Sequence, residues 1–154
     1  MDYLIIKWLH VLFATLLFGT GIGSAFYLLV TTLTRDVRAV SIVAGVVVMA
    51  DFLFTATTVV LQPLTGFWLV YKIGLPLSIS WLKWSIVLYV IAIACWLPVV
   101  VLQIKLRDLA RQANRRGTEL PPSYWRYFTQ WVLLGIPAFF AFLAIFYLMV
   151  AKPV

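Results

Sequence analysis

The stretch WLHVLFATLLFGTGIGSAF, residues 8–26, decides the fold class, because it is long, largely apolar and free of charged residues. A helix of about 20 mostly apolar residues crosses the roughly 30 Å hydrocarbon core of a bilayer. The rest of the chain has the same character: of 154 residues, 64% are hydrophobic and 11% are charged. A soluble protein of this size has no core large enough to hide so much apolar surface. The sequence therefore predicts an integral membrane protein.

Four stretches are long and apolar enough to span a bilayer. They cover about residues 4–29, 40–70, 81–102 and 125–150. The first is too long for a signal-peptide core and lacks a basic start, so we interpret it as a retained span. The predicted fold class is all-α, a bundle of four transmembrane helices that forms one membrane domain over residues 1–154.

The net charge of +7 predicts orientation rather than nucleic-acid binding, because the basic residues cluster beside the spans. The second connection has only Lys72, whereas the first and third are rich in basic residues, which places those two in the cytoplasm and both termini outside. We expect a bacterial inner-membrane protein whose basic connection, about residues 103–124, continues the third helix as far as Gly117. This connection is either a solvated segment that only sets the orientation or a surface that contacts anionic lipid headgroups. The basic residues are Arg35, Arg38, Lys105, Arg107, Arg111, Arg115, Arg116 and Arg126.

Polar residues at membrane depth are costly unless they face the bundle interior or water. On the second span, a helix places five polar residues within a sector of about 80 degrees, over roughly 21 Å of helix. Lipid cannot solvate such a stripe, and an isolated carboxylate costs about 2.5 to 3.5 kcal/mol there. The sequence predicts a polar pocket formed by this stripe together with Lys7. The stripe consists of Asp51, Thr55, Thr58, Gln62 and Thr65.

His10 is the single histidine of the chain. On a helix it shares a face with Lys7, Ala14 and Gly21, and the small residues leave a groove beside the imidazole that a flat ring could enter. Gly19 and Gly23 lie on the opposite face, with the spacing that lets another helix approach closely. The lysines at 7, 72 and 83 are expected to converge with His10, Gln62 and Thr65 in the outer half of the bundle.

Three roles stay open for His10. It can ligate haem or another metal, relay a proton, or serve as a hydrogen-bonded residue near a helix end. A haem here would need a second ligand of another type or would be five-coordinate, since the chain offers no second histidine.

Tryptophans at positions 8, 68, 81, 125 and 131 lie near predicted helix ends, as an interfacial belt requires. Trp84, Tyr89 and Trp96 lie further inside the third span, and we expect them to pack between helices.

Over nearly its whole length the chain resembles a bacterial four-span integral membrane family, the domain of unknown function family 2269. The resemblance rests on WLHVLFATLLFGTG in the first span and DFLFTATTVVLQPLTGFWL in the second. More distantly, the Leu-His dipeptide, the glycines after it and the WLK that opens the third span are similar to the J-type protoporphyrinogen oxidase and the copper-resistance D-type membrane proteins. That similarity implies His10 as a haem b ligand, in a groove with Ala14 and Gly21, and Lys83 as the functional lysine.

Three classes of function are compatible with these residues. The first is a haem-binding, redox-linked membrane protein that uses His10. The second is a small transporter or proton-coupled accessory protein that uses Asp51. The third is a non-catalytic assembly or partner subunit, acting as a homo-oligomer or with another membrane protein.

Overall fold

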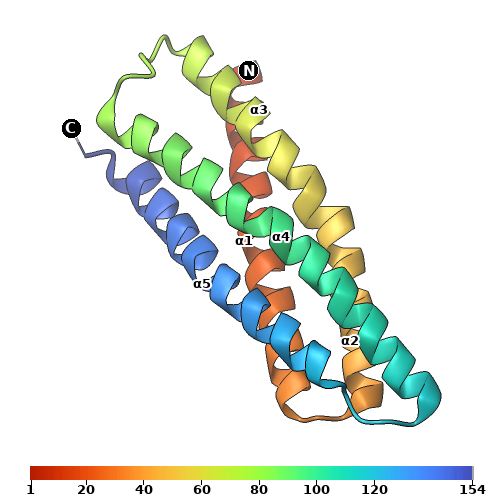
Figure 1. Cartoon of the computed structure of the whole chain (residues 1–154). Coiled ribbons are helices and arrows are strands. Elements are labelled where there is room, and N and C mark those ends of the chain that lie inside the picture. The colour runs from red at the N-terminus through yellow and green to blue at the C-terminus, as the bar shows by residue number, and fades with distance from the viewer. Residues whose placement is uncertain (154) are drawn as a thin grey trace.

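The computed structural model describes residues 1–153 and is helical almost throughout (Figure 1). Four helical lengths are long and apolar enough to cross a membrane, and each contains one of the predicted spans, which confirms the all-α four-span prediction. The second length is interrupted by a π-helical turn. The elements are α1 (Asp2–Leu33), α2 (Val37–Ala50), the π-helical turn η1 (Asp51–Thr55), α3 (Ala56–Lys72), α4 (Ser80–Arg116) and α5 (Pro122–Ala151).

The helix ends near the basic connections follow from local sequence. The Asp36 carboxylate accepts hydrogen bonds from the backbone N–H groups of Arg38 and Ala39, at 3.0 and 3.1 Å, and so caps α2. Gly117 ends α4 in the left-handed conformation, with φ 65°. α5 starts at Pro122, where a missing N–H costs nothing. The predicted extension of the third helix as far as Gly117 is confirmed.

The helices form two layers that separate toward one end. α1 packs on α2, η1 and α3, whereas α4 packs on α5 and on α2. The chain termini and the connection at residues 73–79 lie at the end where the helices spread apart, and the two basic connections lie at the other (Figure 1). An even number of spans necessarily places both termini on one side of a membrane.

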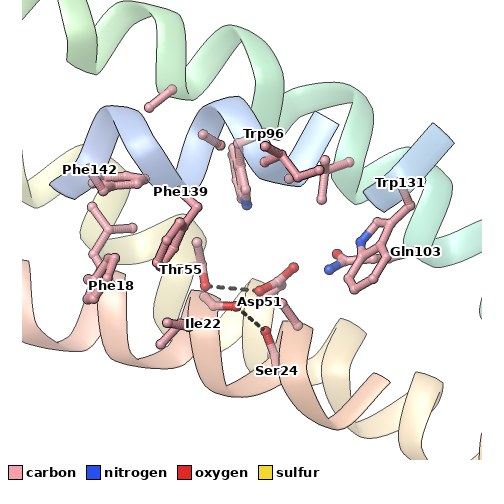
Figure 2. A pocket seen from close by; sticks show the side chains of 18 of the residues that line it. Phe18, Ile22, Ser24, Asp51, Thr55, Trp96, Gln103, Trp131, Phe139 and Phe142 are labelled. Carbon is pink, nitrogen blue, oxygen red and sulfur yellow. Dashed lines mark hydrogen bonds between the residues drawn. The ribbon is translucent and has the colours of Figure 1, made fainter. Parts of the chain in front are cut away.

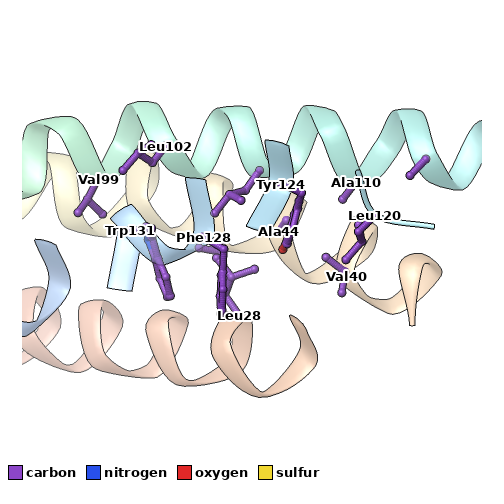
Figure 3. Packing of buried hydrophobic residues seen from close by; sticks show 13 residues of the cluster. Leu28, Val40, Ala44, Val99, Leu102, Ala110, Leu120, Tyr124, Phe128 and Trp131 are labelled. Carbon is purple, nitrogen blue, oxygen red and sulfur yellow. The ribbon is translucent and has the colours of Figure 1, made fainter. Parts of the chain in front are cut away.

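The hydrophobic core is concentrated at the end with the basic connections (Figure 3). There Tyr124 of α5 is fully buried, and its hydroxyl lies 2.9 Å from that of Thr32 of α1. Phe128 stacks on Tyr124 on one side and on Trp131 on the other. The core therefore holds α1 and α5 together through aromatic packing at this end, and it stops at Trp131. Its aliphatic members include Leu28, Val40, Val99, Leu102 and Leu106.

Large apolar side chains are exposed along every helix, as expected for a surface that faces lipid. Trp84 belongs to this surface, with 56% of it exposed, so the prediction that it packs between helices is wrong. A Cβ added to Gly19 or Gly23 would have no atom within 4 Å, so no other helix within residues 1–153 makes the predicted close approach there. Exposed side chains include Val11, Phe26, Phe52, Leu64, Val90 and Phe140.

Pro63 interrupts the hydrogen bonding of α3, and α4 repairs the interruption. In a regular helix the N–H of residue 63 would bond to the carbonyl of Val59, and proline has no N–H. The hydroxyl of Tyr89, on α4, donates to that carbonyl at 2.7 Å. Tyr89 thus lies between helices, as predicted, and contributes a specific hydrogen bond there.

Candidate functional site

His10 is held by α3 through both of its ring nitrogens. Nδ1 lies 2.8 Å from the hydroxyl oxygen of Thr65, and Nε2 lies 3.3 Å from the amide nitrogen of Gln62. The Thr65 hydroxyl is within 2.9 Å of the carbonyl of Leu61 and donates to its own helix. Both ring nitrogens of His10 thus face hydrogen-bonding groups of α3, and the imidazole joins α1 to α3.

This arrangement does not fit a haem ligand, because neither nitrogen of His10 presents a free lone pair to an iron atom. The ring also packs closely on Gly66, where a Cβ would lie 3.1 Å from the imidazole Cε1. The described residues 1–153 contain no group of three or more histidine, cysteine, aspartate or glutamate side chains able to hold a metal ion. Of the roles left open, hydrogen bonding between helices is the one that the geometry supports.

α3 packs against the imidazole of His10 at Gly66, and a cavity lies further along α1. Gly21 lines a cavity together with Leu17 and Phe18, whereas His10 and Ala14 are not part of its wall. His10 and Ala14 therefore do not share this cavity with Gly21.

Three of the six residues expected to converge do meet, namely His10, Gln62 and Thr65. The three lysines have other neighbours or none. The ammonium groups of Lys7 and Lys72 lie over the rings of Tyr3 and Trp68, and Lys83 is exposed. Within residues 1–153, no hydrogen bond joins any of these lysines to the histidine.

The π-helical turn η1 divides the polar stripe into two groups that face different neighbours. Its first residue, Asp51, is 3% exposed and accepts a hydrogen bond from Thr55 at 3.0 Å. Thr58 donates to the carbonyls of Phe54 and Thr55 in its own helix. Gln62 and Thr65 face His10 on α1. Such turns insert one residue into a helix, which shifts the faces on either side relative to each other, and they are frequent at functional sites.

A cavity of about 380 Å³ lies between the two layers, beside Asp51. Its walls come from α1, η1, α3, α4 and α5, and they are apolar except near Asp51 (Figure 2). The lining residues Phe26 of α1 and Phe140 of α5 are exposed, so the cavity opens between these two helices toward the lipid. The volume lies within the range of about 300 to 1,000 Å³ that is usual for small-molecule sites.

Several buried polar atoms around this cavity have no hydrogen-bond partner within the described residues. They are the indole nitrogens of Trp96 and Trp131 and the side-chain oxygen of Gln103. Gln103 is 4% exposed and Trp131 is 6% exposed. In Figure 2 both indole nitrogens point into the cavity, and the Gln103 amide lies close to Asp51. Asp51 forms no ion pair, since the pair found in residues 1–153 joins Arg107 to Asp108.

The sequence does not single out three of these polar groups. The prediction that Trp131 belongs to the interfacial belt is wrong, because its ring is buried between the core and the cavity. Trp96 lies between helices as expected, but the sequence gives no sign of its free N–H. Gln103 falls at the start of the predicted basic connection. The helical pattern does indicate that Trp96 and Gln103 lie on the same side of α4, since positions 92, 96, 99 and 103 share one face of that helix.

The fold and this cavity define a polytopic α-helical membrane protein with an intramembrane polar site. The chain belongs to the family described as predicted integral membrane protein (DUF2269), whose model matches residues 4–153. No curated protein and no solved structure matches the chain.

Proposed function

We propose that this protein binds a lipid-soluble molecule in the cavity between α1 and α5 and works as a small transporter or an accessory carrier. The observation that carries the proposal is the buried side chain of Asp51, which forms no ion pair within residues 1–153 and lies in the wall of a largely apolar cavity. A bound molecule with a hydrogen-bond donor would offset the cost of holding that carboxylate away from water.

The route of entry supports the same proposal. Because the cavity opens beside exposed apolar residues of α1 and α5, a molecule dissolved in the bilayer reaches Asp51 without crossing water. α1 and α5 are joined by the aromatic core at one end, whereas the helices spread apart at the other (Figures 1 and 3). The apolar part of a ligand fits between these helices, and its polar group fits beside Asp51.

Native mass spectrometry in mild detergent tests this proposal with a bromine-labelled long-chain alkanol as the probe. Gly21 lines the cavity and has open space at its Cβ position, so Gly21→Leu places an apolar side chain in the site. Gly19→Leu is the matched control, because Gly19 also has open space but does not line the cavity. We expect Gly21→Leu to weaken probe binding at least about tenfold, the loss expected when a well-packed contact surface is blocked. Equal binding by the two variants would refute the proposal.

We also propose that the protein lies in the bacterial inner membrane with its basic end in the cytoplasm, against anionic headgroups. Lys105 and Arg126 lie 4.9 and 5.5 Å from the ring centre of Tyr127, and no carboxylate pairs with either of them within residues 1–153. A lipid phosphate would neutralise this pair of cations.

Single cysteines at positions 2 and 118, in a Cys95→Ala background, test the orientation with a membrane-impermeant maleimide applied to intact cells. The proposal predicts labelling of the cysteine at position 2 alone. Labelling at position 118 alone would reverse the orientation.

A further inference from the structure

We infer that the polar end of the cavity is built for a phenolic hydroxyl, so that its ligand is a lipid-soluble phenol or hydroquinone with an apolar tail. This inference rests on the proposed function, and it specifies the class of molecule that the same cavity takes.

The unpaired atoms of the cavity fix what the ligand must supply. The indole N–H groups of Trp96 and Trp131 are donors that lack an acceptor, and the side-chain oxygen of Gln103 is an acceptor that lacks a donor. A buried polar atom left without a partner costs about 1 to 3 kcal/mol. A hydroxyl group can pair with either kind of atom, because it accepts from an indole N–H and donates its one proton to a single acceptor, Gln103 or Asp51. A carbonyl group alone would pair with the indoles and leave Gln103 unsatisfied.

The walls around these atoms favour a flat ring. Phe18 of α1 stacks on Phe139 of α5, with the ring centroids 5.9 Å apart, and Phe142 lies at 6.3 Å from Phe18. These rings and Trp96 form one side of the cavity, as Figure 2 shows. Aromatic rings prefer to pack against one another in stacked or edge-to-face arrangements. A phenol ring lying among them would place its hydroxyl toward the polar end.

The opening between α1 and α5 gives an apolar tail of the ligand a path from the cavity into the lipid. Ile22 and Phe26 of α1 and Ile136 and Phe140 of α5 line the cavity and are also exposed. An alkyl or isoprenoid chain attached to the ring would leave the protein between these apolar side chains and enter the lipid. A water-soluble phenol lacks this contact surface.

The test uses decylubiquinol as the probe, with decylubiquinone and the bromine-labelled alkanol as comparators, on the whole protein in nanodiscs without oxygen. The quinone offers a ring with no hydroxyl donor, and the alkanol offers a hydroxyl with no ring. We expect the quinol to bind about 3- to 10-fold more tightly than either comparator, as one additional hydrogen bond or ring contact implies.

Indole N–H resonances provide a readout that general loss of folding would not mimic. The chain has 7 tryptophans, and Trp96→Phe and Trp131→Phe assign two of their signals while keeping an aromatic ring in place. Both signals should shift downfield when the quinol binds, and each substitution should weaken quinol binding by about 3- to 10-fold. Trp84→Phe is the control, because Trp84 is on the lipid-facing surface.

The outcomes separate the two proposals. Preferential binding of the quinol together with shifts of both indole signals supports the inference. If the alkanol or the quinone binds as tightly as the quinol and the two indole signals stay in place, the inference is overturned while the proposed function stands. If none of the three probes binds, both are overturned.

Discussion

Removing the hydroxyl of Tyr89 tests how α3 tolerates its proline. The Tyr89→Phe variant deletes the donor that reaches the Val59 carbonyl at 2.7 Å. That carbonyl has lost its normal helical donor because residue 63 is proline. Interhelical hydrogen bonds in membrane proteins contribute about 0.6 kcal/mol on average and up to about 1.7. Since the carbonyl is left without a donor, we expect a loss near the upper end, about 1 to 2 kcal/mol.

A double-mutant cycle with Pro63→Ala isolates this interaction. Alanine restores an N–H that bonds to the Val59 carbonyl within α3, so removal of the Tyr89 hydroxyl should then cost less than about 0.5 kcal/mol. The free energy of unfolding is measured by reversible unfolding in mixed SDS micelles for the unsubstituted protein, the two single variants and the double variant. Tyr71→Phe serves as the control, because Tyr71 is 84% exposed. An equal cost of Tyr89→Phe with proline or alanine at position 63 would refute the reasoning.

Three further predictions concern other contacts. Gly66→Ala should leave the free energy of unfolding unchanged or lower it, because the added Cβ would lie 3.1 Å from the anchored ring of His10. Gly45→Ala should raise it by about 0.5 to 1 kcal/mol, since the crowded atom there is the flexible end of Arg111. Unfolding in SDS measures both values, and a Gly66→Ala variant that is more stable than Gly45→Ala would contradict the packing argument. Protein purified after expression with a haem supply should show no Soret band that depends on His10, and a band lost in His10→Ala would contradict the hydrogen-bonding role. Thr32→Val should destabilise the aromatic core by about 1 kcal/mol, because the hydroxyl of Tyr124 loses its partner; an unchanged unfolding midpoint would show that this buried bond contributes nothing.

The proposed site favours one of the functional classes that the sequence left open, a carrier that uses Asp51, over a haem protein that uses His10. His10 is committed to Gln62 and Thr65, so the geometry does not support redox chemistry through that residue. Asp51, in contrast, has a cavity beside it and several unpaired polar atoms around it. The observations therefore favour the binding of a lipid-soluble ligand over metal ligation.

The sequence by itself determined the class of fold and the position of the main polar residues. Four apolar stretches must become helices, because the bilayer core offers no water to satisfy free backbone groups. A carboxylate such as Asp51 must face the inside for the same reason. The order of the spans also placed His10, Gln62 and Thr65 at the same end of the bundle, and the structure brings these three together.

Only the tertiary structure decided which polar groups share a site. Helical periodicity gives the face of each residue within a regular helix, but the π-helical turn at Asp51–Thr55 shifts that face, and its presence could not be read from residue types. The cavity depends on how α5 lies against α1 and α4, which is set by the packing of Tyr124, Phe128 and Trp131. Aromatic side chains look alike in a sequence whether they face lipid or the interior, so the sequence predicts the wrong surroundings for both Trp84 and Trp131. Their surroundings are decided by contacts between helices that are distant along the chain.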